Sequence, residues 1–105
     1  MHKLFLAFRR PADAAAFEDG WSQEFVPQAE QMPGIRKVTV SRVVERLAGE
    51  ADLYLVHEFI FDDLAAARAA MASPQGQAAG RALMGLAGEN VSICLVEHLE
   101  EDRRA

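Results

Sequence analysis

The hydrophobic positions of the chain form two kinds of pattern, one typical of strands and one typical of helices. Four stretches are rich in apolar, β-branched and aromatic residues and lack helical spacing, so each predicts a strand. They span residues 3–8, 35–47, 53–61 and 91–99. A short segment with a glycine between charged residues separates the second stretch from the third, so we expect these two strands to form a hairpin.

A helical stripe lies between the first two predicted strands. Its large apolar positions recur every fourth residue, which is typical of one buried helix face. They are Phe17, Trp21, Phe25 and Ala29. Asp13 is a suitable N-cap, so we expect a helix from residue 14 to about residue 32. Pro27 lacks a backbone N–H and crowds the preceding turn, which predicts a kink or break near Phe25.

A second helical region, rich in alanine and glycine, follows the third predicted strand. A pair of aspartates precedes residues 64–72 and is suited to cap them. Ser73 and Pro74 then restart the helix, with the serine as N-cap and the proline at the first helical position, and the second piece extends to residue 88. The small side chains of this region allow a close approach to a sheet.

The resulting order is β-α-β-β-α-β, with the second helix in two pieces. This order is typical of the α+β ferredoxin-like arrangement, a four-stranded antiparallel sheet with helices on one face. The first and last strands do not alternate between apolar and polar residues, as strands with one solvated face do. Their uninterrupted apolar parts are residues 4–8 and 93–96. We therefore expect the second sheet face to be covered by a second copy of the chain, giving a homodimer.

Composition narrows the class of protein. The 105 residues fit one domain, residues 1–105, and are 50% hydrophobic with a net charge of −5, which excludes a disordered chain. The acidic balance argues against nucleic acid as a partner. We expect no signal peptide and no membrane span, because the apolar runs are short and no cleavage pattern follows the start. The charged tail, residues 100–105, is expected to fray.

Cysteine and histidine usage limits the chemistry. A single cysteine, Cys94, excludes an internal disulfide and predicts a reducing, cytoplasmic setting. It lies in an apolar strand and is expected to be buried packing. His2, His57, His98 and Glu97 all lie on predicted strands, but no metal-ligand spacing joins them, so we expect no metal site. The sequence also predicts no cofactor.

His57 is the candidate catalytic residue, because it is the one histidine inside a predicted core strand. A side chain with a reference pKa of about 6.5 can act as a general base. Glu58 must face the opposite side of the sheet, since strand side chains alternate, so the two do not form an acid–base pair. The alternative, which we favour, is a structural histidine satisfied by hydrogen bonds at the sheet face or a dimer interface.

Trp21, Phe25 and Tyr54 are the candidate residues of a ligand pocket. The first two share the helical stripe, and the tyrosine lies on the third strand. They either pack the core or line a cavity, and the two roles overlap because small-molecule pockets are lined by apolar and aromatic side chains.

Several segments in order resemble the EthD family of the dimeric α/β-barrel superfamily. The resemblance covers residues 3 to about 99. It is carried by the tryptophan of the first helix, Pro33-Gly34-Ile35, Phe61-Asp62-Asp63-Leu64 and Ser73-Pro74-Gln75-Gly76-Gln77. It implies a ferredoxin-like dimer with a small-molecule site in each protomer, between sheet and helices. Relatives in the superfamily include cofactor-free monooxygenases and polyketide cyclases.

Two positions depart from the family pattern. Many members carry a histidine between the tryptophan and the proline of the first helix, where this chain has Phe25. Many also carry an aspartate in the last helix, where this chain has Ala82. Two functions therefore stay open. One is an accessory protein that binds a hydrophobic or aromatic small molecule. The other is a cofactor-independent enzyme acting on such a compound.

Overall fold

Four strands form one antiparallel sheet in the order β2-β3-β1-β4, with bounds β1 (His2–Arg9), β2 (Lys37–Arg42), β3 (Leu53–Phe61) and β4 (Val91–Glu97). A computed structural model describes residues 1–103. The apolar stretches form the strands, and the predicted hairpin is confirmed, since β2 pairs with β3. The two central strands, β1 and β3, carry most of the buried strand residues, because they are paired on both edges.

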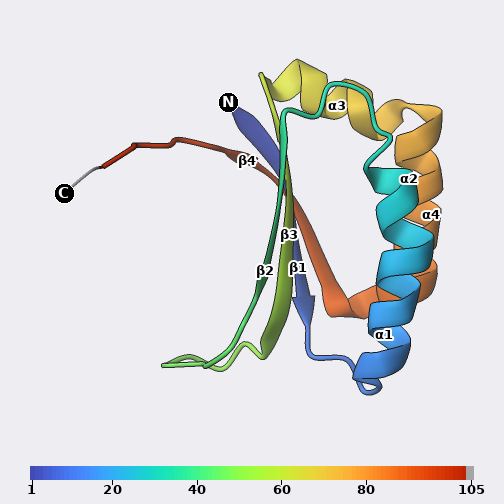
Figure 1. The fold of residues 1–105 in the computed structure, drawn as a ribbon, viewed down its shortest axis with the longest axis vertical. Helices are drawn as coiled ribbons and strands as arrows, with labels where there is room; N and C mark the ends of the chain where they lie inside the picture. The colour runs from blue at the N-terminus through green and yellow to red at the C-terminus, as the bar shows by residue number, and fades with distance from the viewer. Residues whose placement is uncertain (104–105) are drawn as a thin grey trace.

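The helices of residues 1–103 all lie on one face of this sheet (Figure 1). They are α1 (Ala14–Gly20), the π-helical turn η1 (Trp21–Phe25), α2 (Val26–Ala29), α3 (Leu64–Ala72), α4 (Pro74–Ala87) and the 3₁₀ turn η2 (Gly88–Asn90). The predicted caps are in place: Asp13 accepts a hydrogen bond from the amide of Ala16, and Asp63 from that of Ala66. The expected ferredoxin-like arrangement is confirmed. None of the helices among residues 1–103 has the length and apolar character that crossing a membrane requires.

The first helical region continues through the π-helical turn η1 without a break at the proline. The amide of Val26 donates to the carbonyl of Trp21, five residues earlier, which is the π-helical pattern. One residue later, Pro27 has no amide hydrogen to donate, so the wider turn accommodates it. The turn leaves both Trp21 and Phe25 buried against the sheet.

Two predicted strands are shorter than the sequence pattern indicates. β2 ends at Arg42 because its pairing partner β3 begins at Leu53 and offers little further backbone to pair with. Residues 43–52 connect the two strands without a regular element. In this connection Val44 is 97% exposed. β4 ends at Glu97; the amide of His98 still donates to the carbonyl of Met1, and the chain then leaves the sheet on the side without helices (Figure 1). An apolar or β-branched run therefore predicts a strand correctly but overstates its length where no neighbouring strand continues.

The core fills the space between the sheet and the helices. From the sheet it takes the alternate residues Leu4, Leu6, Phe8, Leu55, Phe59 and Phe61, and from the helices Phe17, Trp21, Phe25, Ala29, Ala67, Ala70, Ala79 and Leu83. Alanines dominate the helical side in α3 and α4. α3 lies against β1 and β3, whereas α4 packs mainly against α2, η1 and α3, so the close approach to the sheet expected for the second helical piece is not observed.

The opposite face of the sheet carries none of these helices (Figure 1). It shows half-buried apolar residues such as Phe5 and Val56. Cys94 lies on the edge strand β4 and is exposed, so the expectation that it is buried is wrong for the single chain.

The C-terminal tail is not wholly frayed, since Glu100 contacts Lys37 and His98. The last two residues of the predicted tail, 104–105, lie outside the described residues.

Candidate functional site

His57 lies near the middle of β3 with its ring on the helix side, and it is 1% exposed. Its Nδ1 accepts a hydrogen bond from the indole Nε1–H of Trp21 at 3.2 Å. The residues are 36 positions apart in the chain, so the fold alone joins them. Glu58 points to the opposite face, as the alternation of strand side chains predicts, where it pairs with Lys3.

The hydrogen bond from Trp21 decides which nitrogen of His57 carries the proton. An indole nitrogen is only a donor, so Nδ1 must be the acceptor and the hydrogen of the neutral ring lies on Nε2. Burial lowers the pKa of His57 to about 4, because a charged imidazole would lose its hydration. At neutral pH the ring therefore presents a buried Nε2–H donor.

The Nε2–H of His57 has no hydrogen-bond partner among residues 1–103. The same is true of one other buried side-chain atom in this range, the Nδ1 of His2. Leaving a buried donor unpaired typically costs about 1–3 kcal/mol. The ring is otherwise surrounded by aromatic side chains. The ring centroid of Phe59 lies 4.4 Å away, that of Trp21 5.4 Å and that of Phe25 5.8 Å. His57 is thus a polar group set in an apolar, aromatic layer.

Beside this layer, β1, β4, η1 and the helices α3 and α4 line a partly open cavity of about 280 Å³. Its wall is almost entirely carbon. The lining residues are Leu4, Leu6, Phe25, Met32, Met71, Gly76, Gln77, Ala79, Gly80, Leu83 and Ile93. Gln77 is the one polar side chain among them, and its amide nitrogen donates to the carbonyl of Ala72. The cavity fits apolar contents.

The predicted pocket residues take different places around this cavity. Phe25 lines it, whereas Trp21, Tyr54 and His57 do not. Trp21 and His57 lie next to it, because the ring of Phe25 contacts His57 and Leu6 pairs with His57 across β1 and β3. Leu6 is also a lining residue. Sequence reasoning missed the other lining residues because they come from separate elements and are ordinary core types.

Tyr54 belongs to a polar cluster at the start of β3. The pairing of β1 with β3 shifts between Phe8 and Arg9, so Tyr54 is an extra residue on β3. Such a bulge re-aims a side chain. The hydroxyl of Tyr54 donates to Glu18 at 2.7 Å, and its ring contacts Phe17. This cluster lies toward α1, away from the lining of the cavity.

Glu18 and Arg42 complete that cluster, and sequence reasoning did not single them out. Arg42 donates to Glu18 at 2.8 Å, and its guanidinium lies over the indole of Trp21. The hydrogen bond from Arg42 is the main cause that lowers the pKa of Glu18, and the hydrogen bond to Glu18 raises the pKa of Tyr54. The cluster therefore holds an ionised carboxylate and a protonated phenol, and it fixes the indole that donates to His57.

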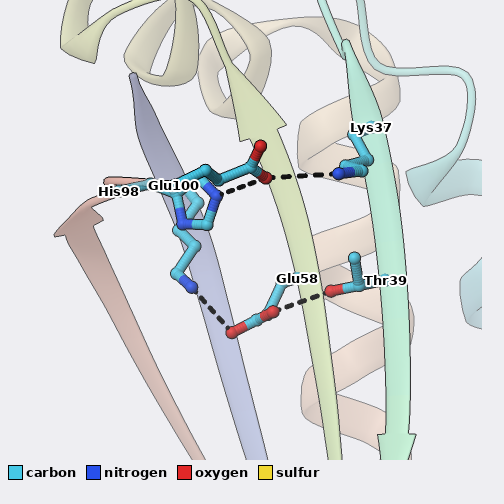
Figure 2. Close-up of polar contacts among 6 residues, drawn as sticks. Lys37, Thr39, Glu58, His98 and Glu100 are labelled. Carbon is cyan, nitrogen blue, oxygen red and sulfur yellow. Dashed lines mark hydrogen bonds and ion pairs between the residues drawn. The ribbon is translucent and has the colours of Figure 1, made fainter. Parts of the chain in front are cut away.

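The open face of the sheet carries a second polar cluster (Figure 2). Glu58 accepts a hydrogen bond from Thr39 at 2.7 Å and pairs with Lys3 at 2.9 Å. Burial raises the pKa of Glu58, but these two partners together outweigh it, so the pKa lies below the ordinary value. Glu100 lies between His98 and Lys37 (Figure 2). All of these groups are paired with one another, which is typical of a structural network.

The histidines considered for a metal site do not come together. His57 faces the helices, and His98 pairs with Glu100 on the other side of the sheet. Within residues 1–103 no group of three or more potential metal ligands is close enough to hold an ion.

A larger hollow of about 590 Å³ lies between α1 and the end of α4. Charged side chains surround it, among them Arg9, Asp13, Asp19 and Glu24. None of these is buried, and none of the predicted site residues lines it. The smaller cavity is the better candidate because it is more apolar and lies beside the buried imidazole.

The fold and the cavity define a ferredoxin-like α+β protein with a carbon-lined cavity between sheet and helices. Residues 9–84 match the EthD domain, and the chain belongs to the EthD family. An uncharacterised 11.0 kDa protein from the thcB-thcC intergenic region of Rhodococcus erythropolis is 26% identical over 97 residues, which are 92% of this chain and 94% of that protein.

Solved structures agree with this assignment. An ethyl tert-butyl ether D (EthD) family protein from Bacillus halodurans superposes with a TM-score of 0.88 at 30% identity, covering 94% of this chain and 99% of that chain. Two more distant structures share the fold alone. SnoaB, a cofactor-independent oxygenase from Streptomyces nogalater, has a TM-score of 0.68 at 20% identity, covering 95% of this chain and 94% of that chain. A dimeric ferredoxin-like protein from Bacteroides fragilis has a TM-score of 0.63 at 19% identity, covering 92% of this chain and 95% of that chain.

Proposed function

We propose that this EthD protein binds a hydrophobic or aromatic small molecule in the cavity between its sheet and α4, and acts as an accessory protein in the degradation of such compounds. The observation that carries the proposal is the carbon-lined cavity of about 280 Å³. Small-molecule sites are typically somewhat larger, about 300–1,000 Å³. The ligand should therefore be compact, on the scale of one or two fused rings.

The surroundings of the cavity favour binding over chemistry. The family's histidine position is Phe25 here, and the position of its last-helix aspartate is Ala82. Both replacements are apolar. The nearby imidazole of His57 is neutral, and its lone pair is occupied by Trp21. The cavity therefore has apolar contact area to offer a ligand and few groups that move a proton.

The test is a binding titration with 2-ethylnaphthalene as probe, followed through the fluorescence of the single tryptophan, which lies beside the cavity. Gly80→Leu places a side chain in the cavity and should weaken binding at least tenfold. Gly85→Leu is the matched control, because it lies on the same helix outside the cavity lining. Absence of saturable binding, or equal effects of the two substitutions, would contradict the proposal.

A second candidate function is a cofactor-independent enzyme, and the buried imidazole beside the cavity favours it. In that case His57 is the catalytic residue, and its Nε2–H polarises a carbonyl of the substrate. Turnover of an aromatic substrate should then collapse in His57→Gln while the far-ultraviolet circular dichroism stays unchanged. Unchanged turnover would exclude this role for His57.

The proposal includes a homodimer in the cytoplasm. The half-buried apolar residues of the open sheet face, Phe5 and Val56 among them, suit contact with a second copy. A distant relative of the same fold is described as dimeric. The single cysteine of the sequence rules out an internal disulfide, which suits a reducing compartment.

A further inference from the structure

Phe25 is the residue that separates the cavity from the buried donor of His57. Its ring lines the cavity, and the same ring lies edge-on to the imidazole with 5.8 Å between the centroids. It is 3% exposed and also contacts Phe59. A molecule inside the cavity therefore meets the ring of Phe25 on the side where His57 lies.

The buried part of the cavity lining offers a ligand no side-chain hydrogen-bond donor. Gln77 lies at the exposed rim, where one hydrogen of its amide is committed to the carbonyl of Ala72, and the other lining side chains are apolar. A buried donor without a partner lies next to this lining: the Nε2–H of His57, whose ring is 1% exposed and fixed by the hydrogen bond from Trp21. The position of the Phe25 ring thus decides whether a ligand reaches this buried donor.

We infer that Phe25 is the specificity-determining residue of the cavity: its ring shields the Nε2–H of His57 and makes the site select hydrocarbon-like ligands over ligands with an acceptor oxygen. This inference rests on the proposed binding function. A carbonyl oxygen buried against this apolar lining loses its water and gains no buried donor, so it is disfavoured. Once the ring is removed, the same oxygen reaches the Nε2–H, and the preference reverses.

The experiment compares two probes that differ by one group. 2-Ethylnaphthalene and 2-acetylnaphthalene have nearly the same shape, but only the second has a carbonyl oxygen. Their dissociation constants are measured by titration calorimetry for the wild type, Phe25→Ala and the double variant Phe25→Ala/His57→Phe. Phe25→Leu, which keeps more of the packing, is measured in parallel, and circular dichroism confirms that each variant is folded.

The wild type should bind the ethyl compound more tightly than the acetyl compound. In Phe25→Ala the ratio of the two dissociation constants should shift by about tenfold toward the acetyl compound, as one added hydrogen bond predicts. Phe25→Leu should shift the ratio in the same direction and by less. The double variant should return to the preference of the wild type, because the donor is gone.

Each other outcome overturns a defined part of the account. If the wild type binds the ethyl compound but Phe25→Ala and Phe25→Leu keep its preference, the inference fails and the binding function stands. If the shift persists without the imidazole, another group supplies the donor and the inference also fails. If the wild type binds neither probe, the proposed function fails, and the inference that rests on it fails too.

Discussion

At the scale of single residues, the hydrogen bond from Trp21 to His57 controls the chemistry of the site. It uses the lone pair of Nδ1 and leaves the hydrogen on Nε2. Glu18 and Arg42 support this contact from the solvent side, since the guanidinium lies over the indole ring at 5.5 Å. The site thus combines a fixed indole, a fixed imidazole and an apolar wall.

The first prediction concerns the tautomer of His57. Nitrogen-15 NMR of the wild type should show the hydrogen on Nε2 at pH 7, because Nδ1 accepts from the indole. Trp21→Phe removes the donor and should release the ring to populate both tautomers. A wild-type spectrum with the hydrogen on Nδ1 would refute the assigned hydrogen bond.

The second prediction is a pH dependence of stability that originates in His57. Its pKa is about 4 in the folded chain, against about 6.5 in an unfolded one. Between these values the unfolded state binds a proton that the folded state does not, so the free energy of unfolding falls as the pH falls. Above about pH 6.5 the imidazole is neutral in both states and does not lower the stability. By pH 4 its protonation in the unfolded state has lowered the free energy of unfolding by about 3 kcal/mol.

Urea unfolding of the wild type and of His57→Phe across this pH range measures the effect. Carboxylates with lowered pKa values, such as Glu58 and Glu100, also lower stability in acid, but they are the same in both proteins. The difference between the two curves therefore isolates the imidazole. Parallel curves would mean that His57 titrates normally.

At the scale of elements, the corner between α3 and α4 holds the wall of the cavity in place. Ser73 accepts a hydrogen bond from the amide of Gly76 at 3.0 Å, and its hydroxyl donates to the carbonyl of Ala70 at 2.6 Å. A Cβ on Gly76 would collide with that same carbonyl of Ala70 and lie 2.6 Å from the carbonyl oxygen of Met71. Only a glycine fits this position, which explains its place in the Ser-Pro-x-Gly segment.

The third prediction follows from this corner. Gly76→Ala should lower the free energy of unfolding by more than about 2 kcal/mol, because the backbone of α3 must move away. Gly85→Ala, on the same helix with open space around its Cβ, should raise it by about 0.5–1 kcal/mol. Thermal unfolding of the two variants measures both changes. Equal effects would show that the corner tolerates a side chain.

The elements themselves were largely predictable from the sequence, because the burial that shapes them leaves a periodic trace. The strands, the helical stripe and the caps at Asp13 and Asp63 were all confirmed. The π turn and the bulge at Tyr54 were not predictable, because they depend on how a segment meets its neighbours. For the same reason the contact of Trp21 with His57 was missed, although both residues were singled out separately.

At the scale of the whole molecule, one sheet face is covered by helices and the other is open (Figure 1). The open face holds the network of Lys3, Thr39 and Glu58 beside apolar residues such as Phe5. A second copy of the chain would bury the apolar residues of this face, and Lys3, Thr39 and Glu58 would keep their hydrogen bonds and ion pair with one another. The uninterrupted apolar stretches of β1 and β4 indicated such a second layer, but sequence alone does not give the geometry of contact between two chains.

The fourth prediction tests this interface. Light scattering should give a mass near twice the 11.5 kDa of one chain for the wild type. Phe5→Asp places a charge on the open face and should yield monomers. Met84→Asp, on the half-exposed outer side of α4, introduces the same charge and should leave the dimer intact. A wild type that runs as a single chain, or a dimer that survives Phe5→Asp, would contradict the proposed interface.

The most direct test of the central claim, an apolar ligand in the cavity, is a methyl NMR titration with 2-ethylnaphthalene. Two of the four methionines, Met32 and Met71, line the cavity, whereas Met1 and Met84 do not. The account predicts saturable shifts of the Met32 and Met71 methyl signals, with those of Met1 and Met84 unchanged. Shifts confined to Met1 and Met84, or no saturable shift at any methionine, would contradict it.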